Sequence, residues 1–309
     1  MSDTVYLPIS ELGEDNFINA PSWNIIKVGH GSDSSFHEVI TNPFPREKNG
    51  KEGEKSGSCG DESKEKNEND NDNDNDNDND NDNDNDNGKV LKAKFNAGSY
   101  CPSAIEGIPG GFGFYSSPQQ IFPCKTVKLS YQLYFDPSFN PIKGGKLPGL
   151  FIGYPGASGG RHPEGSASVR IMWRGEKPKD KNLIMTEAYL YVPKDQDGSY
   201  EHIPKLIRNE TYGDSLWKGI ANLYRNKWNK IEITVTLNTF TGRTPNHDGI
   251  LKLNINNTEL SFDKLLWIPD PGPEIRGIMA STFFGGGSAD WCTPHETFIY
   301  FKDFVINGN

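Results

Sequence analysis

Apolar and polar residues alternate along several stretches of the chain, and this pattern predicts β-strands that bury one face. Every second residue is apolar in residues 127–135, 231–237 and 251–255. Clusters of Gly, Pro and Asn separate these stretches, and no long segment has the 3.6-residue period of a helix. Many short strands with turns between them are typical of an all-β protein, so we expect a jelly-roll β-sandwich of two antiparallel sheets.

The two ends of the chain add strands to this pattern. Residues 23–28 (Trp-Asn-Ile-Ile-Lys-Val) are predicted to form a strand near the N-terminus. Near the C-terminus, four apolar residues are separated by even numbers of positions, which predicts that they share one face of the last strand. They are Phe298, Tyr300, Phe304 and Ile306.

The net negative charge of the chain is concentrated in one tract. The sequence has 32 Lys and Arg against 42 Asp and Glu, a formal net charge of −10. Residues 47–88 hold 16 of the acidic residues and five Lys, a charge of −11, which leaves 27 basic and 26 acidic residues elsewhere. This tract ends in an Asn-Asp repeat and has almost nothing apolar to bury, so it is predicted to be a disordered insertion. It separates the expected N-terminal strands of the sandwich (1–46) from a jelly-roll domain at 89–309.

Charge and hydropathy exclude several classes of protein. The chain has no run of 18 apolar residues, so we expect no membrane span. Basic stretches with interleaved aromatic residues are absent, so we expect no nucleic-acid partner. The first residues, MSDTVYLPIS, lack the features of a signal peptide and suggest a cytoplasmic protein. The Asn-Asp repeat lacks the Gly and terminal Glu of an EF-hand loop, and we expect neither a metal nor another cofactor.

The four cysteines do not have the spacing of a zinc site. Cys59 lies in the acidic tract, and Cys101, Cys124 and Cys292 are far apart in the sequence. A Cys101–Cys124 disulfide is one possibility in an oxidising compartment. Free thiols in a reducing compartment are the interpretation we favour, because no signal peptide is visible.

Polar and charged residues interrupt the usual pattern on two neighbouring predicted strands. In residues 166–174, the apolar side chains fall on one face and Ser168, Arg170, Met172 and Arg174 on the other. Tyr189 and Tyr191 likewise share a face. An Arg can bind a carboxylate through two parallel hydrogen bonds, and Tyr rings stack on sugars. These residue types suit an acidic sugar polymer.

Five motifs in this order resemble those of polysaccharide lyase family 14, and a fungal-type member is the subtype we expect. The motifs are Gly145-Lys-Leu-Pro-Gly149, Ser168-x-Arg-x-Met-Trp-Arg174, Tyr189-x-Tyr191, Ser281-Thr-Phe-Phe-Gly-Gly286 and Tyr300-Phe-Lys-Asp-Phe304. The resemblance covers residues 90–306 and implies a cleft across a concave sheet and β-elimination of polyuronates such as alginate or glucuronan. It also implies that the enzyme is secreted, unlike the compartment suggested by its first residues.

The resemblance also assigns the functional residues. The family's catalytic positions fall on Lys146, Ser168, Arg170, Tyr189 and Tyr191, and a family histidine falls on His162. We assign His162 and Arg174 to substrate binding.

β-Elimination requires a cation at the carboxylate, a base and an acid. Arg170 suits the role of the cation at the carboxylate, and Tyr189 or Tyr191 suits the roles of base and acid. Lys146 is expected to be a base, a carboxylate anchor or the cation that lowers the pKa of a Tyr. Ser168 is expected to position a sugar hydroxyl or orient Arg170.

Two other functions are consistent with parts of the sequence. A non-catalytic carbohydrate-binding protein can have the same sandwich fold, because fold alone does not determine function. Glu164 and Glu187 suggest a glycosidase, but no matched carboxylate pair is evident. We therefore favour the lyase, acting as a monomer on an acidic polysaccharide.

Overall fold

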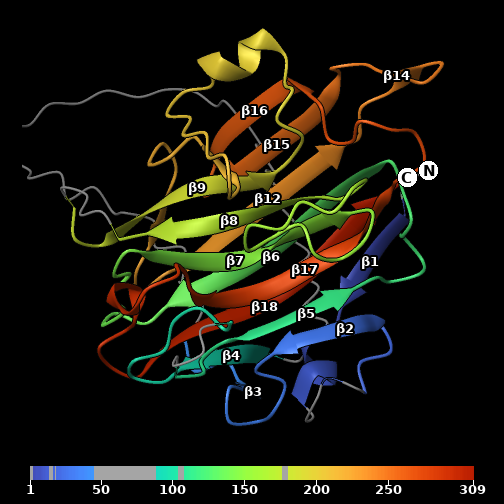
Figure 1. Cartoon of the computed structure of the whole chain (residues 1–309). Helices are drawn as coiled ribbons and strands as arrows, with labels where there is room; N and C mark the ends of the chain where they lie inside the picture. The colour runs from blue at the N-terminus through green and yellow to red at the C-terminus, as the bar shows by residue number, and fades with distance from the viewer. Residues whose placement is uncertain (1–2, 14–16, 18, 45–87, 104–107, 176–179) are drawn as a thin grey trace, which may run out of the picture.

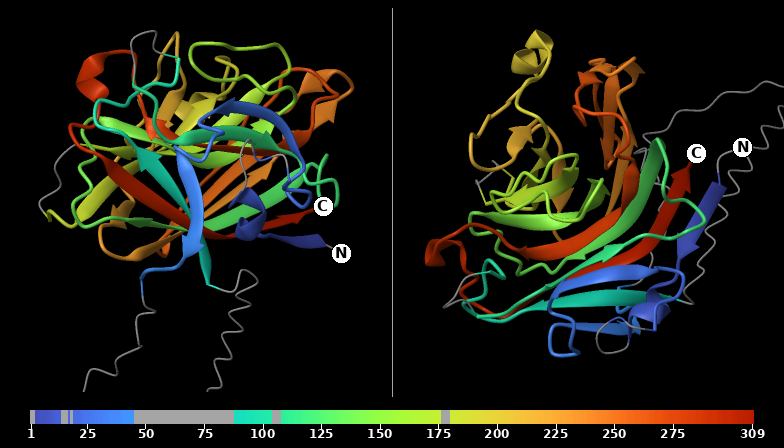
Figure 2. Two further views of the ribbon diagram at one scale, coloured as in Figure 1. Left: turned by 90° about the horizontal axis from the view of Figure 1, so that it is seen from below. Right: turned by 45° about the vertical axis from the view of Figure 1, so that its right-hand side comes forward.

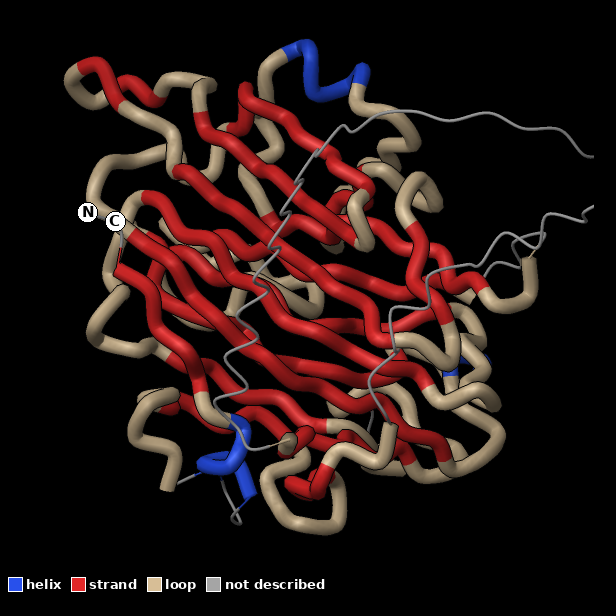
Figure 3. The backbone as a smooth tube through the Cα atoms, turned by 180° about the vertical axis from the view of Figure 1, so that it is seen from behind, coloured by secondary structure: helices blue, strands red, loops and turns tan. Residues whose placement is uncertain are grey.

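The computed structural model describes residues 3–13, 17, 19–44, 88–103, 108–175 and 180–309. Two large antiparallel sheets pack face to face, which confirms the predicted all-β sandwich (Figure 1). The first sheet has the spatial order β16 (Thr258–Leu265), β15 (Gly249–Ile255), β12 (Trp228–Thr236), β6 (Thr126–Phe135), β18 (Thr297–Gly308), β4 (Lys89–Phe95) and β3 (His37–Thr41), with β1 (Asp3–Leu7) also paired to β18. Figure 3 shows this sheet from its outer side.

The second sheet carries the polar strands noted in the sequence. Its spatial order is β10 (Asp214–Leu216), β9 (Leu183–Tyr191), β8 (Ala167–Arg174), β7 (Gly144–Ile152), β17 (Ile275–Phe284), β5 (Phe112–Ser116) and β2 (Ile25–His30), with β11 (Asn222–Tyr224) also paired to β9. The small hairpin β13 (Phe240–Thr241) and β14 (Thr244–Pro245) and the 3-10 helices η1 (Ile9–Gly13), η3 (Gly198–His202) and η4 (Ala289–Trp291) complete the described elements. Both layers and their curvature are visible in Figure 2.

The N-terminal segment contributes strands to both sheets. β1 pairs with β18 and β3 with β4, whereas β2 pairs with β5 of the other sheet. The predicted strand at 23–28 begins later, at Ile25, because a turn that starts at Ala20 ends in Asn24 with a φ of 42°. Of the acidic tract only Gly88 is described; its carbonyl accepts a hydrogen bond from Asn42 N at 2.6 Å. The predicted disorder therefore falls on residues outside the described part.

The hydrophobic core fills the space between the sheets, as the alternation predicts. The apolar residues of 127–135, 231–237 and 251–255 that lie two positions apart all belong to one buried cluster.

The last strand differs from the prediction. Phe304 and Ile306 enter this core, but Phe298 and Tyr300 lie in a separate cluster with Val90 and Tyr134. A bulge between Lys302 and Val305 shifts the register, and Ile299 and Phe301 take the core positions before the bulge.

The three described cysteines are free thiols, which agrees with the favoured interpretation. Cys124 is buried, and burial raises the pKa of its thiol to about 12, so the thiol is protonated at neutral pH. Cys59 lies outside the described residues. Among the described residues, none of the helices has the length and apolar character required to cross a membrane.

Candidate active site

The polar face of β8 is the centre of the candidate site. Alternate residues of this strand belong to the core, and Ser168, Arg170, Met172 and Arg174 occupy the opposite face, as predicted. Pairing with β9 places Tyr189 opposite Arg170. Because paired residues in antiparallel strands share a face, the arginine and the tyrosine lie on one surface.

A bulge in β7 brings Lys146 to the same surface. Lys146 pairs with Met172 and Gly149 with Arg170, so β7 has two residues where β8 has one. One of the two, Leu147, is buried in the core. Lys146 Nζ contacts the Met172 sulfur and lies 3.5 Å from the centroid of the Tyr189 ring. The bulge therefore turns the Lys146 side chain toward β9.

Arg170 is a buried cation with spare hydrogen-bond donors. Its side chain is 2% exposed, and its Nη1 donates to Ser281 Oγ at 3.4 Å. Its Nε has no hydrogen-bond partner, and no salt bridge with a carboxylate is found for it within the described residues. Burial lowers the pKa of Arg170. A buried guanidinium without an anion is costly, and a ligand carboxylate would satisfy it.

Lys146 has an environment that favours the neutral amine. Burial lowers its pKa well below the ordinary value, and the positive charges of Arg170 and Arg174 lower it further. The carboxylate of Glu187 opposes the shift only in part. A neutral amine beside a guanidinium can accept a proton, which is the property of a general base.

The two tyrosine hydroxyls are held by backbone amides from two loops. Gly213 N donates to the Tyr189 hydroxyl at 3.2 Å, and Gly160 N donates to the Tyr191 hydroxyl at 2.9 Å. The ring centroids are 5.7 Å apart. Burial, followed by the neighbouring Tyr191, raises the pKa of Tyr189, and the charge of Arg170 does not offset this. Arg170 lowers the Tyr189 pKa less than burial raises it, so the expectation of a net lowered pKa is wrong for Tyr189. Tyr189 therefore keeps its proton and can act as an acid.

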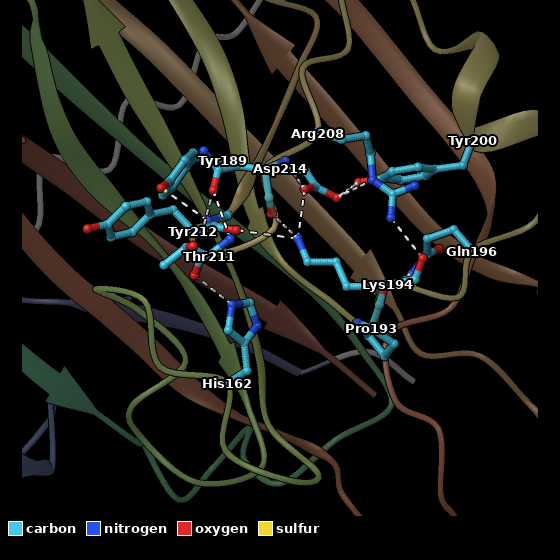
Figure 4. Close-up of polar contacts among 12 residues, drawn as sticks. His162, Tyr189, Pro193, Lys194, Gln196, Tyr200, Arg208, Thr211, Tyr212 and Asp214 are labelled. Carbon is cyan, nitrogen blue, oxygen red and sulfur yellow. Dashed lines mark hydrogen bonds and ion pairs between the residues drawn. The ribbon is translucent and has the colours of Figure 1, made fainter.

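Ser168 and His162 contact loops. The Ser168 hydroxyl is buried and donates to the Ala157 carbonyl at 2.6 Å, so it anchors the loop between β7 and β8. His162 is exposed in that loop, and its Nε2 donates to the Thr211 carbonyl at 3.1 Å (Figure 4). Its ring centroid lies 4.9 Å from that of Tyr191. His162 thus links two loops beside the tyrosine pair.

Arg174 is paired with a protein carboxylate. Its Nη2 lies 2.5 Å from Glu187 Oε1, and the Glu187 side chain is 0% exposed. Ser215 Oγ also donates to this oxygen at 2.9 Å. Arg174 therefore already has a carboxylate partner, whereas Arg170 has none among the described residues. Glu164 is exposed in the loop and Glu187 is buried against Arg174, so these two residues do not form the matched carboxylate pair of a glycosidase.

The structure adds residues to which sequence reasoning gave no role. Ser281 lay in a recognised motif but received no role; its hydroxyl accepts the hydrogen bond from Arg170. His30 lies 5.6 Å from Phe283, centroid to centroid, and burial, with a smaller effect of Arg170, lowers its pKa to about 4. No sequence pattern indicated His30, because it comes close to Phe283 only through the pairing of β2 with β5 in the sheet. Within the described residues, no group of three potential metal ligands occurs.

Comparison with known proteins determines the family. The family model for polysaccharide lyase 14 matches residues 83–304, well over half of the chain. The protein belongs to polysaccharide lyase family 14. All five recognised motifs, from 145–149 to 300–304, lie within the match, whereas His30 lies outside it.

Similar proteins are found in Aplysia kurodai and in Chlorella viruses. The PL-14 alginate lyase of Aplysia kurodai is 31% identical, with a TM-score of 0.61 over 72% of this chain and 83% of that one. Alginate lyase vAL-1 from Chlorella virus is 28% identical, with a TM-score of 0.60 over 72% of this chain and 85% of that one. Exolysin of Paramecium bursaria Chlorella virus 1 is 28% identical over 196 residues, 58% of this chain, and the match spans only 29% of exolysin. The fungal-type subtype stays a prediction.

Proposed function

We propose that this protein is a polysaccharide lyase that cleaves a polyuronate by β-elimination. The observation that carries the proposal is the buried guanidinium of Arg170, which has no carboxylate partner among the described residues and has Lys146 and Tyr189 beside it. The family membership and the alginate lyases among its relatives support the same chemistry.

The site supports a division of roles. Arg170 binds the uronate carboxylate and stabilises the negative charge that develops on it when the C5 proton leaves. Neutral Lys146 takes that proton. Tyr189, whose raised pKa keeps its hydroxyl protonated, gives a proton to O4 as the C4–O4 bond breaks. The products are a new reducing chain and a chain that ends in a C4–C5 double bond.

The remaining predicted residues take supporting roles. Tyr191 and Ser168 hold the loop between β7 and β8 through Gly160 and Ala157, and His162 and Arg174 are proposed to line the substrate path. We propose that a monomer is the acting unit. Alginate and glucuronan are the substrates we propose to test.

Product analysis separates this function from hydrolysis and from binding alone. Incubation with polymannuronate, polyguluronate and glucuronan, followed by mass spectrometry, should give oligomers that lack one water relative to hydrolysis products. Saturated oligomers would indicate a hydrolase. Oligouronate binding in calorimetry without any cleavage would favour the carbohydrate-binding alternative and overturn the proposal.

A further inference from the structure

A fully buried carboxylate lies next to the site, on the short strand β10. Asp214 is 0% exposed, and four polar groups contact its carboxylate (Figure 4). Lys194 Nζ and Asn209 N lie 3.0 Å from its Oδ1, and Arg208 Nε and the Tyr200 hydroxyl lie 3.0 and 3.2 Å from its Oδ2. Both carboxylate oxygens are thus used within the protein, which excludes Asp214 as a ligand for substrate.

These contacts fix the segment that immediately precedes β10. Lys194 also donates to the carbonyls of Asn209 and Tyr212. The Asn209 side chain in turn accepts hydrogen bonds from Thr211 N at 3.0 Å and Tyr212 N at 2.7 Å. Asn209 thus contacts the Asp214 carboxylate through its backbone amide and closes a turn over residues 209–212 through its side chain. Both contacts hold residues 209–213 in place.

The same segment contacts the candidate site at three points. Gly213 N donates to the Tyr189 hydroxyl, and the Thr211 carbonyl accepts from His162. A Cβ on Gly213 would lie 2.9 Å from the Tyr191 ring, so the backbone packs directly against that ring. Figure 4 shows Tyr189, His162 and the residues around Asp214 joined in one chain of contacts.

We propose that Asp214 is a positioning residue of the lyase, which fixes the Gly213 amide and through it the Tyr189 hydroxyl above the reacting bond. The inference rests on the proposed function and deepens it. The Gly213 hydrogen bond occupies an acceptor position of the phenol oxygen, so the hydroxyl proton is directed away from Gly213. Without the Asp214 carboxylate, Lys194 and Arg208 lose their shared counter-ion and Asn209 N loses its acceptor. Residues 209–213 are then held less firmly. A displacement of about 1 Å at a catalytic group costs about 10²-fold in rate.

Three variants separate positioning from general damage. Asp214→Asn removes the charge and keeps the shape. Asn209→Ala loosens the same segment at an exposed residue, so it tests the inference even if Asp214→Asn does not fold. Glu201→Gln is the matched control. Glu201 is exposed and pairs with Arg208, and within the described part of the chain no hydrogen bond or ion pair joins it to residues 209–213.

The decisive readout compares two substrates. On the polyuronate, Asp214→Asn should lower kcat about 10²-fold with little change in KM, Asn209→Ala should lower it several-fold, and Glu201→Gln should leave it unchanged. A synthetic uronide with an acidic phenol at C4 needs no protonation of its leaving group. On that substrate, kcat should fall much less in Asp214→Asn than it does on the polyuronate. An equal loss on both substrates, or an unchanged kcat on the polymer, would overturn the inference.

A spectroscopic measurement remains informative if the wild type cleaves no polyuronate. Failure of the wild type alone would contradict the proposed function. The ¹³Cζ resonance of Tyr189, assigned with Tyr189→Phe, reports the hydrogen bond to its hydroxyl without any turnover. It should shift in Asp214→Asn and Asn209→Ala but not in Glu201→Gln. An unshifted resonance in folded Asp214→Asn would contradict the positioning role.

Discussion

Lys146 differs strongly from an ordinary surface lysine. Its side chain is 8% exposed and lies against the Tyr189 ring, close to two arginines. Its pKa is lowered in the folded state, so between the folded and unfolded pKa values the unfolded chain binds more protons. By linkage, Lys146 destabilises the fold at low and neutral pH, and this cost disappears as the pH rises to the unfolded value.

Substitution of this lysine should therefore increase stability. We expect Lys146→Met to raise the free energy of unfolding at pH 7 by about 1 kcal/mol or more, a Tm gain of about 2–4 °C. The gain should shrink as the pH approaches 10, because wild-type Lys146 then loses its charge in both states. Thermal unfolding at several pH values checks this. A gain that grows with pH would contradict the assigned pKa direction.

Arg170 offers a test of catalysis with little effect on folding. Arg170→Ala removes the charge meant for the uronate carboxylate, and we expect kcat to fall about 10²–10³-fold. Because Arg170 has no carboxylate partner among the described residues, its loss should leave the Tm nearly unchanged or higher. Arg174→Ala is the comparison: it leaves buried Glu187 without its cation, so it should lower the Tm as well. Equal effects of the two variants on Tm would contradict the distinction.

At the residue scale, the sequence predicted which side chains share a surface. It did not predict their hydrogen-bond partners or their pKa values. Alternation alone placed Ser168 and Arg170 on one face. It could not show that the Ser168 hydroxyl is used by Ala157, or that burial outweighs the nearby cation in setting the Tyr189 pKa. These properties depend on how loops cover the strand, and loop packing leaves no periodic pattern.

Among the elements, β7 determines how far the site strands can approach one another. A Cβ on Gly149 would lie 2.0 Å from the Val169 carbonyl oxygen and 2.8 Å from Arg170 Cα. Gly149→Ala should therefore push β7 from β8 at Arg170, destabilise the fold by about 3 kcal/mol and lower activity. Gly198→Ala, where a Cβ meets nothing within 4 Å, should stay within about 0.5 kcal/mol of the wild type in urea unfolding. Similar free energies of unfolding for the two variants would contradict the close approach of β7 to β8 at Gly149.

Two bulges mark the limit of prediction at the element scale. Alternation identified the core faces of β6, β12 and β15, which are regular in the residues used for the prediction. It failed on β18, where Asp303 has a φ of 54° and the bulge there reverses the parity of the residues beyond it. The β7 bulge similarly escaped the pattern, although the Pro and Gly in KLPG are residues expected near bulges.

For the whole molecule, the net charge of −10 does not describe the surface of the folded part. Residues 47–87 carry the same −11 as residues 47–88, since Gly88 is neutral, and the rest of the chain is near +1. The described residues on either side of the tract are already joined, because Thr41 pairs with Lys89 and Asn42 N donates to Gly88 O. A short loop can therefore close this hairpin.

Replacement of residues 47–87 by a short Gly-Ser loop should leave the Tm unchanged or a few degrees higher, since a shorter connection costs less entropy to close. The KM for a polyuronate should fall at low salt, because repulsion between the acidic tract and an anionic polymer is removed, and this difference should vanish at high salt. A control with each Asp of the repeat changed to Asn keeps the length and should reproduce most of the KM effect. A KM difference independent of salt would contradict an electrostatic origin.

The most direct test of the proposed function is the ultraviolet absorbance of the C4–C5 double bond during incubation with polymannuronate, polyguluronate or glucuronan. We expect the wild type to produce this absorbance on at least one of the three polymers, and Arg170→Ala to produce it about 10²–10³-fold more slowly at an unchanged fold. No absorbance on any polymer, or equal rates for the wild type and Arg170→Ala, would contradict β-elimination at this site.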